Sequence, residues 1–178
     1  MYGVLLAELE KFVGARYGKA TWAALLDEAG LEPETFVPEN RYPDAHLSAI
    51  LRAVPAALPP PIAGLAEDFG AFVAPELLRR YAHLILPSWR TLEILNHAEA
   101  IYGGFADAIF GTAAPVLRGE RTGKSEVTLT YASHRRLCAL AKGLARGMAG
   151  HFGESVEVRE PACMLQGADA CSIVVRKL

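Results

Sequence analysis

The hydrophobic pattern of the first third of the chain predicts helices. Apolar residues recur at helical spacing from Val4 to Val13 and again from Thr21 to Ala29. Glycines at positions 18 and 30 follow these runs and indicate where the two helices end. After a connection that holds prolines and an asparagine, Asp44 is a suitable N-cap for a third helix that extends to about Ala53. The N-terminal region is therefore expected to be helical.

Prolines and glycines predict where the following helices are interrupted. Four prolines in residues 54–61 exclude a regular helix there. A helix expected from Ile62 to Phe72 is predicted to break at Ala74-Pro75. Residues 76–110 are again apolar and helical in pattern, with interruptions at Pro87 and at Gly103-Gly104.

After Gly111 the pattern becomes alternating. Residues 125–131 have a period of two and are rich in β-branched side chains, which predicts a strand. A long helix is expected from Arg135 to Phe152, followed by strands at Ser155–Arg159 and Cys171–Lys177 that a turn with Gly167 joins. This order predicts an α+β fold. We expect one domain, residues 1–178, in which a helical subdomain of about residues 1–60 packs on a subdomain of about residues 61–178 with long helices and a small antiparallel sheet.

Composition narrows the class of protein. The 178 residues are 52% hydrophobic and 21% charged, with a net charge of −2, which excludes a disordered chain and a strongly basic nucleic-acid binder. The chain shows neither an apolar run of about 18 residues, as a membrane span needs, nor the features of a leader peptide. We therefore expect a cytoplasmic protein that binds neither nucleic acid nor membrane. Three cysteines in such a chain indicate metal binding, redox chemistry or core packing rather than disulfides.

Tyr131, Ser133 and Arg135 lie two residues apart where the predicted strand meets the predicted helix. A period of two puts the three side chains on one face while the chain stays extended. Two hydroxyls and a guanidinium are donors that suit carboxylates, and a helix N-terminus adds a positive potential. Such a group suits the propionates of a haem or another di-acid. The same spacing also fits a tyrosine at a strand end, a serine N-cap and a solvated arginine.

The three cysteines form a candidate metal site. Cys163 and Cys171 flank the turn between the last two predicted strands, and Cys138 lies near the start of the long helix. Three thiolates would leave zinc in need of a fourth ligand, for which Glu160 and His134 are candidates. The spacing between Cys163 and Cys171 is not a usual zinc spacing, so the cysteines also fit the description of small buried hydrophobic residues.

The sequence argues against an enzyme. It contains no nucleophile elbow, phosphate-binding loop, dinucleotide-binding fingerprint or zinc-protease motif. Ser133 and Cys138 have His134 close by in sequence, but such neighbours do not face each other productively. Of the five histidines, only His97, in the apolar helical block, is a candidate haem ligand.

The segment YASHRRLCALAKGLARGMAGHF, with its Y-x-S-x-R signature, resembles the H-NOX (haem nitric oxide/oxygen binding) family. The likeness extends from the opening MYGVLLAELEKFVGARYG to the final CMLQGADACSIVVRKL. It implies that Tyr131, Ser133 and Arg135 hold the propionates of haem b and that Pro115 presses on the haem and distorts it. It also implies a zinc site, because some bacterial members hold zinc through three cysteines and one histidine. Cys138, Cys163 and Cys171 match the thiol positions, and Glu160 occupies the position of the histidine.

The resemblance also implies an iron ligand that this chain lacks. The family uses a histidine 13 residues before the proline and three after an acidic residue, and these counts lead to Tyr102 and Glu99. His97 lies about 140° around a helix from Tyr102, so it replaces the ligand only if the helix moves. Tyrosinate is a known ligand of ferric haem. Three outcomes are open: haem ligated by Tyr102, haem held by its propionates and apolar contacts, or a pocket that takes another ligand.

Five apolar residues match the distal pocket of the family: Leu5, Leu9, Ala74, Leu140 and Leu144. None of them offers a hydrogen-bond donor to a bound gas, so the resemblance implies an NO-selective pocket that excludes oxygen. The same residues also fit an ordinary core.

These expectations describe a sensor that binds haem, or a haem-like carboxylate ligand. It would signal gas or redox state to a separate partner, such as a histidine kinase or a cyclic-di-nucleotide enzyme. The alternative is a haem-independent module that senses through a bound ligand or through zinc and its thiols.

Overall fold

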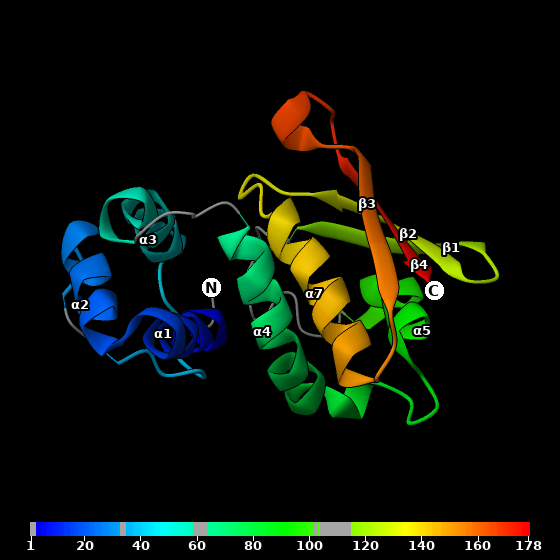
Figure 1. The fold of residues 1–178 in the computed structure, drawn as a ribbon, viewed down its shortest axis with the longest axis horizontal. Coiled ribbons are helices and arrows are strands. Elements are labelled where there is room, and N and C mark those ends of the chain that lie inside the picture. Colours follow the sequence, from blue (N-terminus) through cyan, green and yellow to red (C-terminus); the bar gives the residue numbers. More distant parts are fainter. Residues whose placement is uncertain (1–2, 33–34, 59–63, 102, 104–114) are drawn as a thin grey trace. The chain divides into compact units, whose positions relative to one another are not determined.

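A computed structural model describes residues 3–32, 35–58, 64–101, 103 and 115–178. The chain forms two compact units, Met1–Leu65 and Ala66–Leu178. The division expected near residue 60 falls among residues that are not described. The predicted α+β class is confirmed, because the second unit combines helices with a four-stranded antiparallel sheet (Figure 1).

The first unit contains the helices α1 (Val4–Tyr17), α2 (Lys19–Glu28) and α3 (Asp44–Ala57). Its core holds Leu6, Leu25 and Ile50, each with no exposed surface. The prediction that residues 54–61 hold no regular helix is wrong for residues 54–57. Pro55 lies exposed in the last turn of α3 and lacks the N–H that would donate to the Leu51 carbonyl, so the helix ends only two residues after it.

The second unit is built on a sheet with the strand order β1-β2-β4-β3. The strands are β1 (Val116–Gly123), β2 (Glu126–Ala132), β3 (Val156–Ala162) and β4 (Cys171–Lys177). Helix α5 (Thr91–Asn96) packs on β1 and β2, and α7 (Cys138–His151) packs on β3 and β4. Together, α5 and α7 therefore cover all four strands of the sheet. A short 3-10 helix, Met164–Gln166, joins β3 to β4.

Helix α4 (Leu65–Arg80) lies against α7 through backbone contact (Figure 1). A Cβ atom at Gly143 of α7 would collide with the carbonyl oxygen of Glu67 on α4, so only glycine allows the two helices to come this close. The predicted break at Pro75 is wrong, because α4 continues to Arg80. Since Pro75 has no N–H, the Ala71 carbonyl lacks its helical donor, and this carbonyl faces Gly147 of α7.

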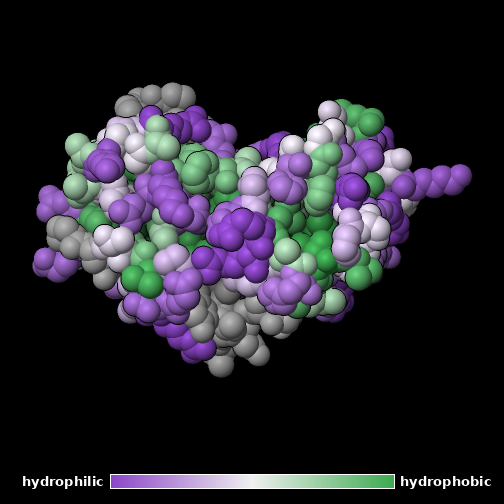
Figure 2. Space-filling model, turned by 90° about the horizontal axis from the view of Figure 1, so that it is seen from below, coloured by the Kyte–Doolittle hydropathy of each residue, from purple (hydrophilic) through white to green (hydrophobic). Residues whose placement is uncertain are grey.

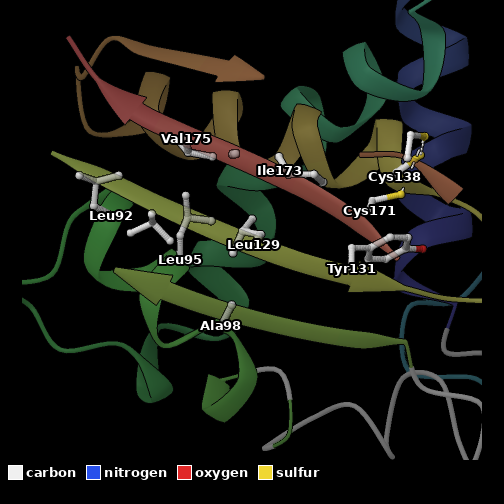
Figure 3. Packing of buried hydrophobic residues seen from close by; sticks show 12 residues of the cluster. Leu92, Leu95, Ala98, Leu129, Tyr131, Cys138, Cys171, Ile173 and Val175 are labelled. Carbon is white, nitrogen blue, oxygen red and sulfur yellow. Dashed lines mark hydrogen bonds between the residues drawn. The ribbon is translucent and has the colours of Figure 1, made fainter. Parts of the chain in front are cut away.

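The inward faces of β2 and β4 form the core of the second unit. Buried residues stand opposite one another in three successive pairs: Val127 and Val175, Leu129 and Ile173, Tyr131 and Cys171. Figure 3 shows this row with the helical residues that cover it. The register thus brings Tyr131 and Cys171 to the same end of the core.

The pattern did not predict strand β1. Its sequence, VLRGERTG, alternates weakly because it is an edge strand with charged residues and a central glycine. Gly119 is required there, since a Cβ atom would collide with the carbonyl oxygen of Leu95 on α5. The helical prediction for residues 76–110 is also wrong in part, because residues 81–90 contain only a 3-10 turn, Ala82–Leu84, between α4 and α5.

The surface is mixed in character. Hydrophilic side chains cover much of the face shown in Figure 2, and apolar residues lie between them. Among the described residues, no helix is both long and apolar enough to cross a membrane.

Candidate functional site

Tyr131, Ser133 and Arg135 lie at the end of β2. Tyr131 belongs to the strand, Ser133 follows it, and Arg135 lies in a turn where its N–H donates to the Ser133 hydroxyl at 3.2 Å. The predicted helix start at Arg135 is wrong by three residues, since α7 begins at Cys138. Arg136 has a φ of 52°, a left-handed conformation that helices do not contain, and this reverses the chain before α7.

The three side chains offer hydrogen-bond donors in a largely buried place. Tyr131 and Ser133 are buried and Arg135 is half-buried. The Tyr131 hydroxyl accepts a hydrogen bond from the N–H of Leu137 at 3.1 Å and also lies within hydrogen-bonding reach of the Ser133 side chain. Burial raises the pKa of Tyr131, which keeps the phenol protonated at neutral pH. This group, called the carboxylate clamp below, can therefore donate from two hydroxyls and a guanidinium.

The structure brings the three cysteines and Glu160 together. Their ligand atoms, three sulfurs and a carboxylate oxygen, all lie within 4.8 Å of one another. Cys163 is central, with its Sγ 3.7 Å from that of Cys138 and 3.9 Å from that of Cys171. All three cysteines are buried and free of disulfides. His134, the other candidate for the fourth ligand, is not part of this cluster, called the Cys/Glu cluster below.

Three elements position the Cys/Glu cluster. Cys138 is the first residue of α7, Cys171 is the first residue of β4, and Cys163 follows β3. Glu160 lies where the register of β3 against β4 shifts, between Arg159 and Ala162. A bulge of this kind re-aims a side chain, and Pro161 within it has no N–H to donate to the ladder.

The side chains of the Cys/Glu cluster differ in their hydrogen bonds and in the direction of their pKa shifts. The N–H of Met164 donates to the Sγ of Cys171 at 3.2 Å. Burial raises the pKa of Cys138 to about 12. Burial is the largest influence on the pKa of Glu160 and acts to raise it, but the hydrogen bond and charge of Lys142 and the neighbouring thiols together outweigh burial, so the pKa lies below its usual value. The cluster thus combines the protonated thiol of Cys138 with an ionised carboxylate.

The carboxylate clamp and the Cys/Glu cluster share a boundary. Tyr131 stands opposite Cys171 in the sheet, and its hydroxyl binds the backbone of Leu137, the residue before Cys138. Figure 3 shows Tyr131 beside Cys171 and Cys138 at one end of the core. The two candidate sites are therefore neighbours within one unit.

The residues expected near the haem iron are only partly described. Tyr102 lies outside the described residues, while Pro115 is half-buried immediately before β1. Glu99 is exposed and pairs with Arg118, with N–O distances of 3.1 and 3.2 Å. His97 stacks on Trp89 with ring centroids 4.2 Å apart, and its Nδ1 lies 2.8 Å from the carbonyl oxygen of Glu93. His97 is thus engaged with Trp89 and with the backbone of Glu93.

The five residues matched to the distal pocket lie on three helices. Leu5 and Leu9 are buried in α1, and Ala74 is buried in α4. Leu140 and Leu144 are half-buried on α7, and both contribute backbone atoms that lie close to Gly70 of α4. Ala74, Leu140 and Leu144 therefore gather where α4 meets α7.

Sequence reasoning missed the charged residues that surround the Cys/Glu cluster. Lys142 on α7 pairs with Glu160 at 2.9 Å and lies 3.8 Å from Glu67 on α4. Glu67 also pairs with Arg146 of α7. The signal was present in the sequence, because Lys142 follows Cys138 by four residues and therefore lies on the same face of the helix.

Comparison with known proteins identifies the class to which this fold and site belong. The family model for haem-NO-binding domains matches residues 2–160. A crystal structure of an H-NOX protein from S. oneidensis, a triple-alanine mutant in the Fe(II) state, has a TM-score of 0.88 and 26% identity, covering 100% of this chain and 96% of that chain. The Fe(II)NO structure of an H-NOX protein from S. oneidensis has a TM-score of 0.87 and 25% identity, covering 100% and 99%.

An NMR structure of an H-NOX domain from Shewanella oneidensis, in the Fe(II)CO state, has the same fold, with a TM-score of 0.83, 24% identity and coverage of 100% and 99%. No curated protein matches the sequence. The family match covers most of the chain, so the protein belongs to the haem-NO-binding (H-NOX) family. The resemblance inferred from the sequence is thereby confirmed.

Proposed function

We propose that this protein is a sensor that holds haem b through its propionates in the carboxylate clamp. The gathering of Tyr131, Ser133 and Arg135 at one strand end carries the proposal, since two buried hydroxyls and a half-buried guanidinium suit carboxylates. When bound, haem would supply the iron at which a gas such as NO is sensed. In this proposal Pro115 presses on the haem, and the residues on the gas-binding side are Leu5, Leu9, Ala74, Leu140 and Leu144.

Tyr102 is the proposed iron ligand, by its position 13 residues before Pro115. Reconstitution of the purified protein with haem tests this assignment by absorption spectroscopy. We expect a Soret band that Tyr102→Phe shifts or weakens, because tyrosinate is lost as a ligand of ferric iron. Tyr81→Phe, a change at another tyrosine of the same unit, is the matched control and should leave the spectrum unchanged. A spectrum that Tyr102→Phe does not alter would exclude Tyr102, and the absence of any Soret band would exclude haem.

The second part of the proposal is a zinc site in the Cys/Glu cluster. The Sγ distances of 3.7 and 3.9 Å agree with the edge of a tetrahedron of zinc–sulfur bonds, about 3.8 Å for bonds of about 2.3 Å. The Oε1 atom of Glu160 is buried without a hydrogen-bond partner in the described structure, so it is available as a fourth ligand. Zinc would hold the four side chains in one geometry and keep the thiols from oxidation.

Metal analysis of protein purified without chelator tests the zinc proposal. We expect about one zinc per chain, and protected thiols that react only after a chelator is added. Protein without zinc whose three thiols react freely would contradict it. Zinc in a protein that takes up no haem would instead favour the haem-independent sensor, for which the Cys/Glu cluster is the specific support.

The proposed output is a change in a separate signalling protein, such as a histidine kinase or a cyclic-di-nucleotide enzyme. The absence of catalytic motifs from the sequence supports a sensor rather than an enzyme. Kinase or cyclase assays with the purified partner, with and without NO, test this output.

A further inference from the structure

The two oxygens of Glu160 have different surroundings. Oε2 accepts a hydrogen bond from the Lys142 ammonium at 2.9 Å, while Oε1 is buried and has no hydrogen-bond partner among the described residues. The ligand atom that Glu160 contributes to the Cys/Glu cluster lies within 4.8 Å of the three sulfurs. A carboxylate can satisfy both demands at once, because one oxygen can bind a metal while the other stays bound to the lysine.

The net negative charge of a zinc-loaded Cys/Glu cluster would make a nearby cation stabilising. Three thiolates and one carboxylate carry four negative charges against two positive charges of zinc, so the loaded site would have a net charge of about −2. A histidine in place of Glu160 would leave about −1. The Cys/Glu cluster therefore carries an additional negative charge in a buried place, where an uncompensated charge is costly.

Lys142 is suited to compensate that charge. Its side chain is 22% exposed and that of Glu160 is 12% exposed, so water screens the pair less than it screens a surface ion pair. Glu67 also lies 3.8 Å from Lys142, but Glu67 has its own cation in Arg146. The shorter distance shows that Lys142 is engaged mainly with Glu160. Because Lys142 and Cys138 lie one turn apart on α7, the helix that supplies one thiol also supplies the cation.

We propose that Lys142 is a positioning residue of the zinc site: it holds Oε2 of Glu160 so that Oε1 faces the three thiols, and it offsets the charge of the carboxylate. The proposal rests on the zinc part of the proposed function.

Zinc affinity, measured by competition with a chromophoric chelator, tests the proposal. We expect Lys142→Met to weaken zinc binding about tenfold or more, as loss of a partner that orients a ligand does. Lys142→Arg should recover most of the affinity, since it keeps the charge and a donor. Lys177→Met is the matched control, because Lys177 also pairs with a glutamate, Glu154, at 2.5 Å but at the other end of β4. It should bind zinc as tightly as the unsubstituted chain.

A double variant shows whether Lys142 acts through Glu160. If it does, Glu160→Gln and the combination of Lys142→Met with Glu160→Gln should have zinc affinities within about twofold of each other. Cobalt in place of zinc gives a second readout, because the visible spectra of Lys142→Met and Glu160→Gln should change in the same way.

Three results would overturn the proposal. If the unsubstituted chain binds no zinc, the metal site itself is wrong, and the role of Lys142 falls with it. If it binds zinc and Lys142→Met binds equally well, the zinc site stands but Lys142 does not position its ligand. If the losses from the two substitutions multiply in the double variant, Lys142 acts on zinc by another route.

Discussion

The carboxylate clamp and the Cys/Glu cluster adjoin each other, yet the chain builds them in opposite ways. The clamp takes its three side chains from positions 131, 133 and 135 at the end of one strand. The Cys/Glu cluster takes its side chains from α7, β3, β4 and the segment after β3. The clamp is therefore a local structure, while the cluster exists only when helix and sheet have packed together.

The two sites also differ in the charge that they suit. The clamp presents donors and a positive charge, which suit an anionic ligand. The cluster presents thiols and a carboxylate, which suit a cation once the thiols lose their protons. Neighbouring sites of opposite preference should therefore respond to different substitutions.

The largest expected effect is on the cluster, from Cys163→Ser. Cys163 is the central thiol, so we expect zinc to be lost and, with it, the stabilisation that zinc gives the folded chain. That stabilisation is about 4 kcal/mol when free zinc exceeds the dissociation constant about a thousandfold. Thermal unfolding with and without a chelator measures it: the unsubstituted chain should lose stability on chelation, whereas Cys163→Ser should not respond. Ser172→Ala, next to Cys171 on β4, is the control and should respond like the unsubstituted chain.

The next effect is on the clamp, from Arg135→Gln. Loss of a charge-assisted hydrogen bond to a propionate costs about 1.5–3 kcal/mol, which corresponds to a loss of haem affinity of about 10- to 150-fold. Arg136→Gln is a closely matched control, because Arg136 is the next residue but is exposed. Haem titration followed at the Soret band separates the two variants. Equal affinities for both would mean that Arg135 does not bind the propionates, and a change in zinc content would mean that the two sites are not separable.

The smallest expected effect is on stability, from a change at Glu154. This residue lies near the end of the sheet away from the clamp and the cluster, so a change there should leave both sites unaffected. Glu154 pairs with Lys177 at 2.5 Å and accepts a hydrogen bond from the N–H of Thr91 at 3.2 Å. Burial acts to raise the pKa of Glu154, but these partners outweigh it, so the pKa lies below its usual value. The ionised form therefore stabilises the folded state above the pKa of the unfolded chain, and this contribution disappears as the pH falls through the lower folded-state pKa.

We expect Glu154→Gln to lower the free energy of unfolding by about 1 kcal/mol at pH 7. The difference from the unsubstituted chain should shrink as the pH falls below about 4. Urea unfolding at a series of pH values measures both. A difference that grows as the pH falls would show that the sign of the pKa shift is wrong.

The sequence predicts those parts of the fold whose pattern is local. The bounds of β4, Cys171–Lys177, agree with the prediction, because alternation is clear in a strand with one buried face. Strand β1 was missed because Gly119 interrupts the alternation of its side chains. A glycine is needed there so that the carbonyl oxygen of Leu95 can approach the strand. Pro75 misled the prediction because α4 packs closely against α7, and sequence periodicity does not reveal a contact between helices so far apart in the chain.

In the candidate sites too, the sequence predicts what depends on local spacing and misses what depends on contacts between distant segments. Spacing alone singled out Tyr131, Ser133 and Arg135, although it placed Arg135 in a helix rather than in a turn. It also singled out the three cysteines but left Glu160 and His134 as alternatives, and only the folded structure brings Glu160 rather than His134 to the three thiols. Lys142 was missed because its pairing with Glu160 brings together a helix and a strand that lie apart in the chain, and Glu160 stands at an irregularity of β3 that the sequence pattern does not reveal.

The pairing of Tyr131 with Cys171 has a consequence for insertions and deletions in the chain. A slip of one residue between β2 and β4 would turn every inward side chain of the slipped strand outward. Tyr131 would then leave its place in the clamp, or Cys171 its place in the cluster, depending on which strand slipped. A single added residue inside β2 should therefore displace Tyr131 from the clamp, and one inside β4 should displace Cys171 from the cluster, whereas a residue added at the exposed turn between β1 and β2 should spare both sites.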